Sequence, residues 1–381
     1  MKKDYARQDI SKYSFRQIHC WWVAVGLMLA CAGVSRAEEG AGVTDAPALP
    51  FAWELSQRNL PMLCADFDYP VRQVIIDGEV WMIFVPGRQA YGGRCPVLRY
   101  KGPDLEHLER QPDGVADLHG GSGHLGCGMW LDESTKTLYG LIHTEYGGND
   151  GGGWTNKKTR LATSKDLGLT WTLAGDILTR ALPNREDYSG SSFEMGPADF
   201  DFYADTRGGY FYVTCWNGFV AKKGQLNSFV TYSEVARCPI ADKMAPGKWF
   251  KFCNGTWTEP GLGGKASRVG FSRRGIYGNT IYSTYLKKYL RIGIHAGVVD
   301  PRFTKLGFLD SSVNISACTD LAKQDWLPMA KLLDEPANHL FGFTLADAGG
   351  IDPVTCGRTL CAYNFWLDGN RALDITLNEG S

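Results

Sequence analysis

Short runs of aromatic and β-branched residues, each ending in a glycine, asparagine or aspartate turn, recur along most of the chain. The clearest runs span residues 74–76, 80–85, 138–143, 210–216 and 289–294. Runs of this kind are typical of β-strands bounded by turns. Long helical periodicity is hard to find, and Pro328 interrupts the one stretch with some apolar spacing, at 321–333. The pattern therefore predicts an all-β fold.

The expected strands group into units of about forty to seventy residues, the size of β-propeller blades. The units span residues 64–110, 119–178, 193–257, 269–333 and 339–377. A sheet of three or four strands buries both of its faces only by stacking radially on its neighbours. We predict a β-propeller with five blades, or with six if residues 51–55 complete a further blade. A two-sheet sandwich is the alternative.

The N-terminal region has the features of an export signal. Basic residues come first, and an apolar run at 21–34 ends in Ser-Arg-Ala at 35–37. The run is shorter than the roughly twenty apolar residues of a membrane span. We therefore expect a cleaved signal peptide over 1–37, a flexible tether rich in Gly, Ala and Pro over 38–50, and a single propeller domain over 51–381. An uncleaved anchor is the alternative, and the mature protein is expected to be secreted or periplasmic with no membrane span.

Charge is balanced along the chain, with 40 basic and 41 acidic residues and a net charge of −1. Nucleic acids and anionic membranes need concentrated positive charge on their partners, and the chain has no basic block. Neither is an expected partner.

Cysteine usage permits disulfide bonds without specifying them. Eleven cysteines are present, and nine remain after removal of Cys20 and Cys31 with the signal. In an oxidising compartment, bridges between residues 238 and 253 and between 356 and 361 are plausible. The alternative is that most of these residues are small buried hydrophobes. No CxxC pair occurs, so a structural zinc site is not indicated.

The sharpest motif spans residues 164–171, where Ser-Lys-Asp-Leu-Gly-Leu-Thr-Trp fits the pattern S-x-D-x-G-x-T-W. Serine and aspartate side chains can bond the backbone of a tight turn, and Gly168 can take a positive φ. Thr170 re-enters a strand and Trp171 buries a large ring. The segment resembles the Asp-box of sialidases and related glycan-active propellers. The resemblance implies a structural turn between the third and fourth strands of a blade, away from the active site.

Two further segments resemble the five-bladed arabinanase and xylosidase-like glycosidases. Residues 193–197, Phe-Glu-Met-Gly-Pro, look like their Glu-Gly-Pro segment, and residues 282–289 resemble a strand pair common in such propellers. Those enzymes place a base Asp on the first blade, a supporting Asp on the second and an acid Glu on the third. The Arg-Ile-Pro signature of sialidases proper is absent; the nearest segment is 71–73. The resemblance implies a polysaccharide or oligosaccharide substrate, and no cofactor is expected.

Carboxylates near the expected inner strands are candidates for hydrolysis, which needs one protonated and one ionised carboxyl group. Glu194 is the candidate general acid, because its apolar neighbours can raise its pKa by desolvation. Asp66 or Asp68 on the first blade is the candidate base. Asp199 and Asp201 follow Glu194 and are candidates for substrate binding. The alternative for each is an ordinary surface or turn carboxylate.

Histidines gather in the second unit, where glycine-rich backbone surrounds His124. His143 and Glu145 lie two residues apart and should point to one face of a strand, where they can reach a sugar hydroxyl together. Glu145 is a further candidate catalytic residue, and His124, His143 and Tyr146 are candidates for substrate binding. Together with His119 the histidines lack recognised metal-ligand spacing, so no metal is expected.

Residues 257–265 form a glycine-rich segment whose Glu259 and Lys265 suit a rim that contacts substrate. Trp154, Trp216 and Trp257 can stack on sugar faces, although most tryptophans should pack between blades.

The leading functional hypothesis is a secreted glycoside hydrolase. One alternative is a polysaccharide lyase in which His124 or His143, with Tyr146, abstracts a proton next to a uronate that Arg160 neutralises. The other is a non-catalytic propeller that binds glycans. Two facing carboxyl groups favour hydrolysis, and a His-Tyr-Arg set favours elimination.

Overall fold

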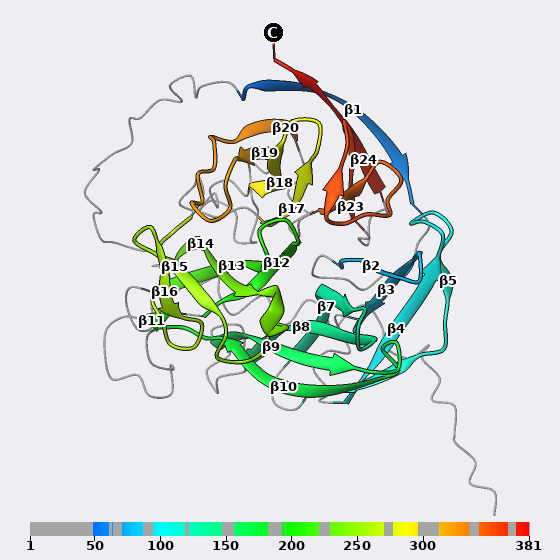
Figure 1. Ribbon diagram of the computed structural model, residues 1–381, viewed down its shortest axis with the longest axis vertical. Coiled ribbons are helices and arrows are strands. Elements are labelled where there is room, and N and C mark those ends of the chain that lie inside the picture. The colour runs from blue at the N-terminus through cyan, green and yellow to red at the C-terminus, as the bar shows by residue number, and fades with distance from the viewer. Residues whose placement is uncertain are drawn as a thin grey trace, which may run out of the picture.

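Nearly all regular structure in the computed structural model is β-strand (Figure 1). The structure describes residues 49–60, 63, 71–86, 94–118, 122–146, 156–181, 193–194, 196–220, 229–269, 277–295, 312–334, 343–364 and 371–380. Within these ranges the one helical element is a short 3-10 helix at Ile240–Asp242. None of these residues lies in a helix that is long and apolar enough to span a membrane.

The strands form four hydrogen-bonded sheets, and the nine-stranded sheet spans two blades because a parallel pairing of residues 170–171 with 115–116 joins them. Five blades, here numbered 1 to 5 along the chain, thus surround a common axis (Figure 1). Blade 1 contains β2 (Val74–Ile76), β3 (Glu79–Phe84) and β4 (Arg94–Gly102), with β5 (Glu109–Arg110) and β6 (Gly114–Asp117) both paired to β4. Blade 2 contains β7 (Ser122–Asp132), β8 (Thr137–Tyr146), β9 (Asn156–Ser164) and β10 (Thr170–Leu178). Blade 3 contains β11 (Phe193–Glu194) and β12 (Ala198–Asp205), both paired to β13 (Tyr210–Val220), then β14 (Phe229–Pro239), β15 (Phe250–Cys253) and β16 (Thr256–Pro260). Blade 4 contains β17 (Tyr277–Ser283), β18 (Lys288–His295), β19 (Ser312–Cys318) and β20 (Ala330–Asp334), with β22 (Thr355–Cys356) paired in parallel to β17. Blade 5 contains β21 (Thr344–Asp347), β23 (Thr359–Asn364), β24 (Arg371–Glu379) and β1 (Phe51–Asn59).

Burial along the strands follows from this radial stacking. β3 and β19 are buried at nearly every position, because neighbouring blades cover both of their faces. The outermost strands β1 and β16 are exposed at many positions. Strands β2, β7, β12, β17 and β21 contact one another across blade boundaries, as innermost strands should. Apolar clusters fill the spaces between blades, for example Ile83 with Ile142 and Ile281 with Leu360.

The predicted all-β propeller with five blades is confirmed, and residues 51–55 do not form a sixth blade. They belong to β1, which pairs antiparallel with β24 from Phe51 opposite Glu379 to Asn59 opposite Arg371. The N-terminal strand is thus the outermost strand of the last blade. This pairing closes the ring between the first and the last strand that the structure describes (Figure 1).

The turn at 164–171 joins β9 to β10, the third and fourth strands of blade 2. The Ser164 hydroxyl accepts a hydrogen bond from the backbone N of Gly168 (2.8 Å), and Asp166 accepts one from the backbone N of Thr170 (2.9 Å). Gly168 has φ +83°, and the buried Trp171 ring donates to the Gly168 carbonyl at 3.2 Å. The turn also docks on blade 1, where the backbone N of Val115 donates to the carbonyl of residue 169 at 2.7 Å. Its position and hydrogen bonds are those that the motif predicts, and the kinship with sialidases stays a prediction.

The eight cysteines in the described ranges are all free thiols, and seven of them are buried. The prediction of disulfide bonds 238–253 and 356–361 is therefore wrong. The β14–β15 register sets Ala236 opposite Lys251, which carries Cys238 and Cys253 out of alignment. Cys356 and Cys361 pack in different apolar clusters. These thiols behave as small buried hydrophobes.

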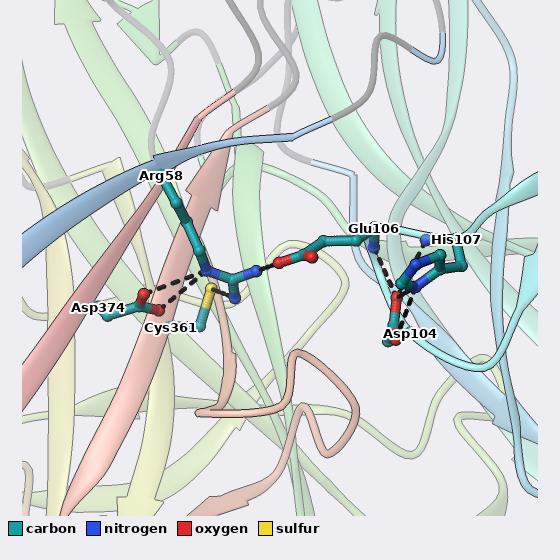
Figure 2. Close-up of polar contacts among 6 residues, drawn as sticks. All are labelled: Arg58, Asp104, Glu106, His107, Cys361 and Asp374. Atoms are coloured by element: carbon teal, nitrogen blue, oxygen red, sulfur yellow. Dashed lines mark hydrogen bonds and ion pairs between the residues drawn. The ribbon is translucent and has the colours of Figure 1, made fainter.

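Arg58 at the end of β1 ties blade 5 to blade 1 (Figure 2). Its Nε lies 3.1 Å from Oδ2 of Asp374 on β24, and its NH2 donates to Sγ of Cys361 on β23 at 3.6 Å. Its NH1 forms an ion pair with Glu106, in the loop after β4 of blade 1. Asp104 fixes that loop by accepting a hydrogen bond from the backbone N of Glu106 at 2.8 Å. Arg58 therefore reinforces the closure made by β1.

We expect Arg58→Gln to lower the free energy of unfolding by about 1 kcal/mol, since partly exposed ion pairs contribute no more than this. Urea denaturation at low and high salt measures the loss, which should shrink at high salt. Lys101→Gln is the matched control, because Lys101 pairs with Glu79 at 2.5 Å within blade 1 alone. Equal losses of unfolding free energy in both variants would show that the contacts of Arg58 between blades 5 and 1 add no extra stability.

Candidate active site between blades 2 and 3

Four charged side chains meet where blade 2 packs on the inner strand of blade 3. His143 contacts Glu145 through Nε2 (3.2 Å to Oε1) and Asp199 through Nδ1 (2.9 Å to Oδ1). Nζ of Lys157 lies 2.8 Å from Oε1 of Glu145 and 2.5 Å from Oδ2 of Asp199. Each cation therefore touches both carboxylates. We call these four residues the charged cluster.

The β8–β9 hairpin places three members of the charged cluster on one face. Glu145 lies directly opposite Lys157 in the register, and His143 lies opposite Thr159. Residues two apart on a strand share a face. His143, Glu145 and Lys157 therefore all point toward blade 3.

Asp199 reaches the charged cluster because β12 is bulged at this residue. The register pairs Ala198 with Trp216 and Phe200 with Cys215, which leaves Asp199 as the extra residue. Its φ of +46° is unusual for a residue with a side chain. Such strain commonly occurs at functional sites, and a bulge re-aims the side chain it carries.

The bulge also separates Asp199 from Asp201, although the two residues are only two apart. Asp201 is buried on the other side of β12, where it accepts hydrogen bonds from the backbone N of Thr214 (3.1 Å) and from the Thr280 hydroxyl (3.3 Å). Burial raises the pKa of Asp201, and Arg291 opposes this effect. Asp201 thus belongs to the boundary between blades 3 and 4.

The segment before the bulge is fitted closely against β9. Gly196 has φ +109°, and a Cβ built on it would lie 2.0 Å from the Lys157 carbonyl oxygen. The Thr159 hydroxyl donates to the Pro197 carbonyl at 3.0 Å. A larger residue at 196 would force Lys157 or the bulge to move.

Opposite charges decide the protonation states in the charged cluster. Burial alone would lower the pKa of His143, but Asp199 and Glu145 outweigh burial and raise it to about 9. Burial would raise the pKa of Glu145, but Lys157 and His143 lower it to about 2. The same two cations hold the pKa of Asp199 well below its usual range despite burial. At neutral pH the charged cluster therefore contains two cations and two anions.

Nδ1 of His143 lies close to two groups of Asp199, the carboxylate and the backbone N–H. This nitrogen lies 2.9 Å from Oδ1 and 3.0 Å from the backbone N of Asp199. A protonated Nδ1 donates to the carboxylate, whereas a neutral Nδ1 accepts from the backbone N–H. The bulge thus offers a partner to either form of the imidazole.

The carboxylates are the more accessible members of the charged cluster. The side chains of Glu145 and Asp199 are 16% and 12% exposed, whereas those of His143 and Lys157 are 4% exposed. Trp216 is partly exposed beside them, with Nζ of Lys157 5.2 Å from its ring centroid.

The donor atoms of His143, Glu145 and Asp199 lie within 4.8 Å of one another, close enough to surround a metal ion. The Lys157 ammonium contacts both carboxylates, however, and already supplies their positive partner. A divalent cation beside this ammonium would be repelled. The arrangement is that of an ion-pair network.

Several predicted site residues meet here. The prediction that His143 and Glu145 share a face is borne out by their contact. Asp199 joins them, and His124 on β7 is buried with its ring centroid 5.2 Å from that of His143. Lys157 was not predicted. Its place opposite Glu145 depends on a hairpin register that the sequence does not reveal.

Other predicted residues lie apart from the charged cluster or outside the described ranges. Glu194 on β11 is partly buried, and its Oε2 accepts a hydrogen bond from the backbone N of Ala181 at 2.9 Å. Glu259 accepts one from the backbone N of Lys265 at 2.9 Å, which closes the glycine-rich loop on itself. Asp66, Asp68, His119, Trp154 and the side chain of Tyr146 lie outside the described residues.

Neither a protein-family model nor a curated protein matches the sequence.

Solved structures of glycoside hydrolases resemble the chain at low sequence identity. A family 117 glycoside hydrolase of the marine bacterium Zobellia galactanivorans is 11% identical with a TM-score of 0.46, and the match covers 86% of this chain and 91% of the other. An exo-β-1,3-galactanase of Phanerochaete chrysosporium is 11% identical with a TM-score of 0.47, covering 84% and 63%. A family 32 β-fructofuranosidase of Bombyx mori is 12% identical with a TM-score of 0.46, covering 84% and 61%. These likenesses are distant, so the chemistry of the site is inferred from the residues of this chain.

The raised pKa of His143 predicts a loss of stability at alkaline pH. Its contribution is fully present below the unfolded value of about 6.5 and is lost as pH rises through about 9. We expect the free energy of unfolding to fall by about 1 to 3 kcal/mol over this range. Urea denaturation at several pH values measures the fall.

His143→Gln should be less stable at pH 6 and should lack most of this slope. His107→Gln is the control, because His107 also faces a carboxylate, Asp104, at 2.8 Å but is 67% exposed. The same slope in wild type and His143→Gln would contradict the assigned charge state.

Proposed function

We propose that the chain is a carbohydrate-active β-propeller of the glycoside hydrolase type, with its site at the charged cluster and Trp216. One observation carries the proposal: Glu145 and Asp199, two ionised carboxylates, are held by the same two cations beside a partly exposed aromatic ring. Glycosidases use a pair of carboxyl groups at the scissile bond. Aromatic faces suit the apolar faces of sugar rings.

The geometry supports distinct roles for the carboxylates. Asp199 and Glu145 have lowered pKa values, which suits a base, a nucleophile or a stabiliser of positive charge in the transition state. Glu194 stays the candidate general acid; it lies five residues before Asp199 on the same inner edge of blade 3, and its carboxylate contacts the backbone N of Ala181. Asp66 and Asp68 stay alternative candidates for the base.

The lyase alternative receives less support. Arg160, the residue that would neutralise a uronate, points to the opposite face of β9 from Lys157, because the two are an odd number of residues apart. There it lies 3.3 Å from Asp176 and donates to the Leu118 carbonyl at 2.9 Å. His143 and Arg160 therefore face different blades. Such a pair cannot act together on one uronate.

Export to the periplasm or the cell exterior is part of the proposal. Its support is the N-terminal pattern of basic, apolar and small residues over 1–37. A polysaccharide that cannot enter the cell requires an enzyme outside it. N-terminal sequencing of protein purified from the native host tests whether the mature chain begins after Ala37.

We expect Asp199→Asn and Glu145→Gln to reduce kcat/KM by roughly 10²- to 10⁴-fold, since each removes a charge next to the reacting bond. A panel of p-nitrophenyl glycosides and of plant and algal polysaccharides provides the assay. Asp176→Asn is the matched control, because Asp176 forms a comparable ion pair with Lys158 (2.7 Å) on the opposite face of β9.

Two outcomes would count against the proposal. Wild-type turnover that survives both carboxylate substitutions would exclude the charged cluster as the active site. Binding of glycans without any turnover would instead identify a recognition propeller. Unchanged turnover in Glu194→Gln would remove Glu194 from the role of general acid and leave the cluster in place.

A further inference from the structure

A line of buried polar side chains crosses blade 3 behind the charged cluster. Nζ of Lys251 on β15 lies 3.3 Å from Oε1 of Glu234 on β14. Oε2 of Glu234 accepts a hydrogen bond from Nδ2 of Asn217 on β13 at 3.0 Å. Asn217, Glu234 and Lys251 are 1%, 3% and 1% exposed, so water cannot replace these contacts.

These three residues share the face of blade 3 that packs on blade 2. Glu234 lies opposite Cys215 in the register, and Lys251 lies opposite Ala236. Cys215 and Ala236 belong to the apolar cluster that also contains Leu141 of blade 2. Lys251 reaches the far side of the same boundary, where its Nζ donates to the Thr179 carbonyl at 2.8 Å.

The line ends at the segment that carries Asp199. Oδ1 of Asn217 accepts a hydrogen bond from the backbone N of Gly196 at 3.0 Å. Gly196 is the residue packed against the Lys157 carbonyl, three positions before Asp199. The segment 196–199 is thus held by Asn217 on one side and by β9 on the other.

The charges along the line determine which way the Asn217 amide points. A carboxylate only accepts hydrogen bonds, so Glu234 requires the NH2 group of Asn217 to face it. The oxygen of the same amide must then face Gly196. Lys251 in turn fixes the orientation of Glu234 through their 3.3 Å contact.

Stability of the fold alone does not account for a buried ion pair. Desolvation of two charges is costly, and apolar residues of similar volume often stabilise a protein as well or better. What apolar residues cannot provide is the fixed direction of the Asn217 amide and, through it, the hydrogen bond to Gly196.

We propose that Lys251, Glu234 and Asn217 are positioning residues, which fix the bulge at Asp199 and thereby set the contacts of Asp199 with His143 and Lys157. The effect on turnover rests on the proposed function, whereas the effect on the charged cluster does not.

The double variant Glu234→Leu with Lys251→Met tests this role, because it removes the ion pair without leaving one charge buried alone. We expect a folded protein with a thermal midpoint a few degrees below that of wild type, because the buried Nδ2 of Asn217 loses its hydrogen bond to Glu234. With histidine labelled with carbon-13, NMR titration should show the pKa of His143 falling from about 9 toward the ordinary value of about 6.5. On whichever glycoside wild type cleaves, kcat should fall roughly 10- to 100-fold with KM nearly unchanged.

Tyr289→Phe is the control, because it removes a buried hydrogen bond to Asp205 (3.2 Å) at the boundary of blades 3 and 4. It should change neither the His143 titration nor kcat. Asn217→Ser is a milder second variant for use if the double variant does not fold, and a smaller change in the same direction is expected.

A folded variant of either kind in which His143 titrates as in wild type would overturn the positioning role. If wild type cleaves no glycoside but the His143 titration shifts as expected, the positioning role stands and the proposed function fails. A normal titration with reduced kcat would also refute the proposal, because the substitutions would then act on turnover by another route.

Discussion

Every blade of this propeller has two faces to bury, and only its neighbours can cover them. Strands such as β3 and β19 are therefore buried at almost every position, and the spaces between blades are filled by apolar clusters. A charged side chain placed in such a space must find its partners there, because water is excluded. The buried charges between blades 2 and 3 are accordingly balanced. The charged cluster contains two cations and two carboxylates, and Lys251 pairs with Glu234 behind it.

The predictable part of the fold is the part that depends on local pattern. The runs at 138–143 and 210–216 lie within β8 and β13, and the turn at 164–171 joins two strands of one blade. These features arise from neighbours in the chain, so the sequence reveals them. The pairing of β1 with β24 joins residues more than three hundred positions apart, and no local signal marks it. Residues 51–55 could thus be recognised as a strand but not assigned to a blade.

The difference between local pattern and long-range pairing also explains which residues of the candidate site could be predicted. His143 and Glu145 share a face because a strand alternates with period two, and this was predictable. The rule fails at Asp199 and Asp201, because a bulge that the sequence does not announce sends them to different blade boundaries. Lys157 joins the charged cluster through a hairpin register, which a single sequence leaves open.

The net charge of the charged cluster depends on the protonation state of His143. With His143 protonated, the four members sum to zero, which lets them remain buried. Loss of one proton from His143 leaves a net negative charge, concentrated on the two carboxylates that are the more exposed members. Under the proposed function, these carboxylates would stabilise positive charge that develops on a sugar ring. Nδ1 of the neutral imidazole can accept the backbone N–H of Asp199, so His143 has a partner on the bulge after it loses the proton. The strained backbone at Asp199 thus brings both a carboxylate oxygen and a backbone N–H within reach of His143 Nδ1.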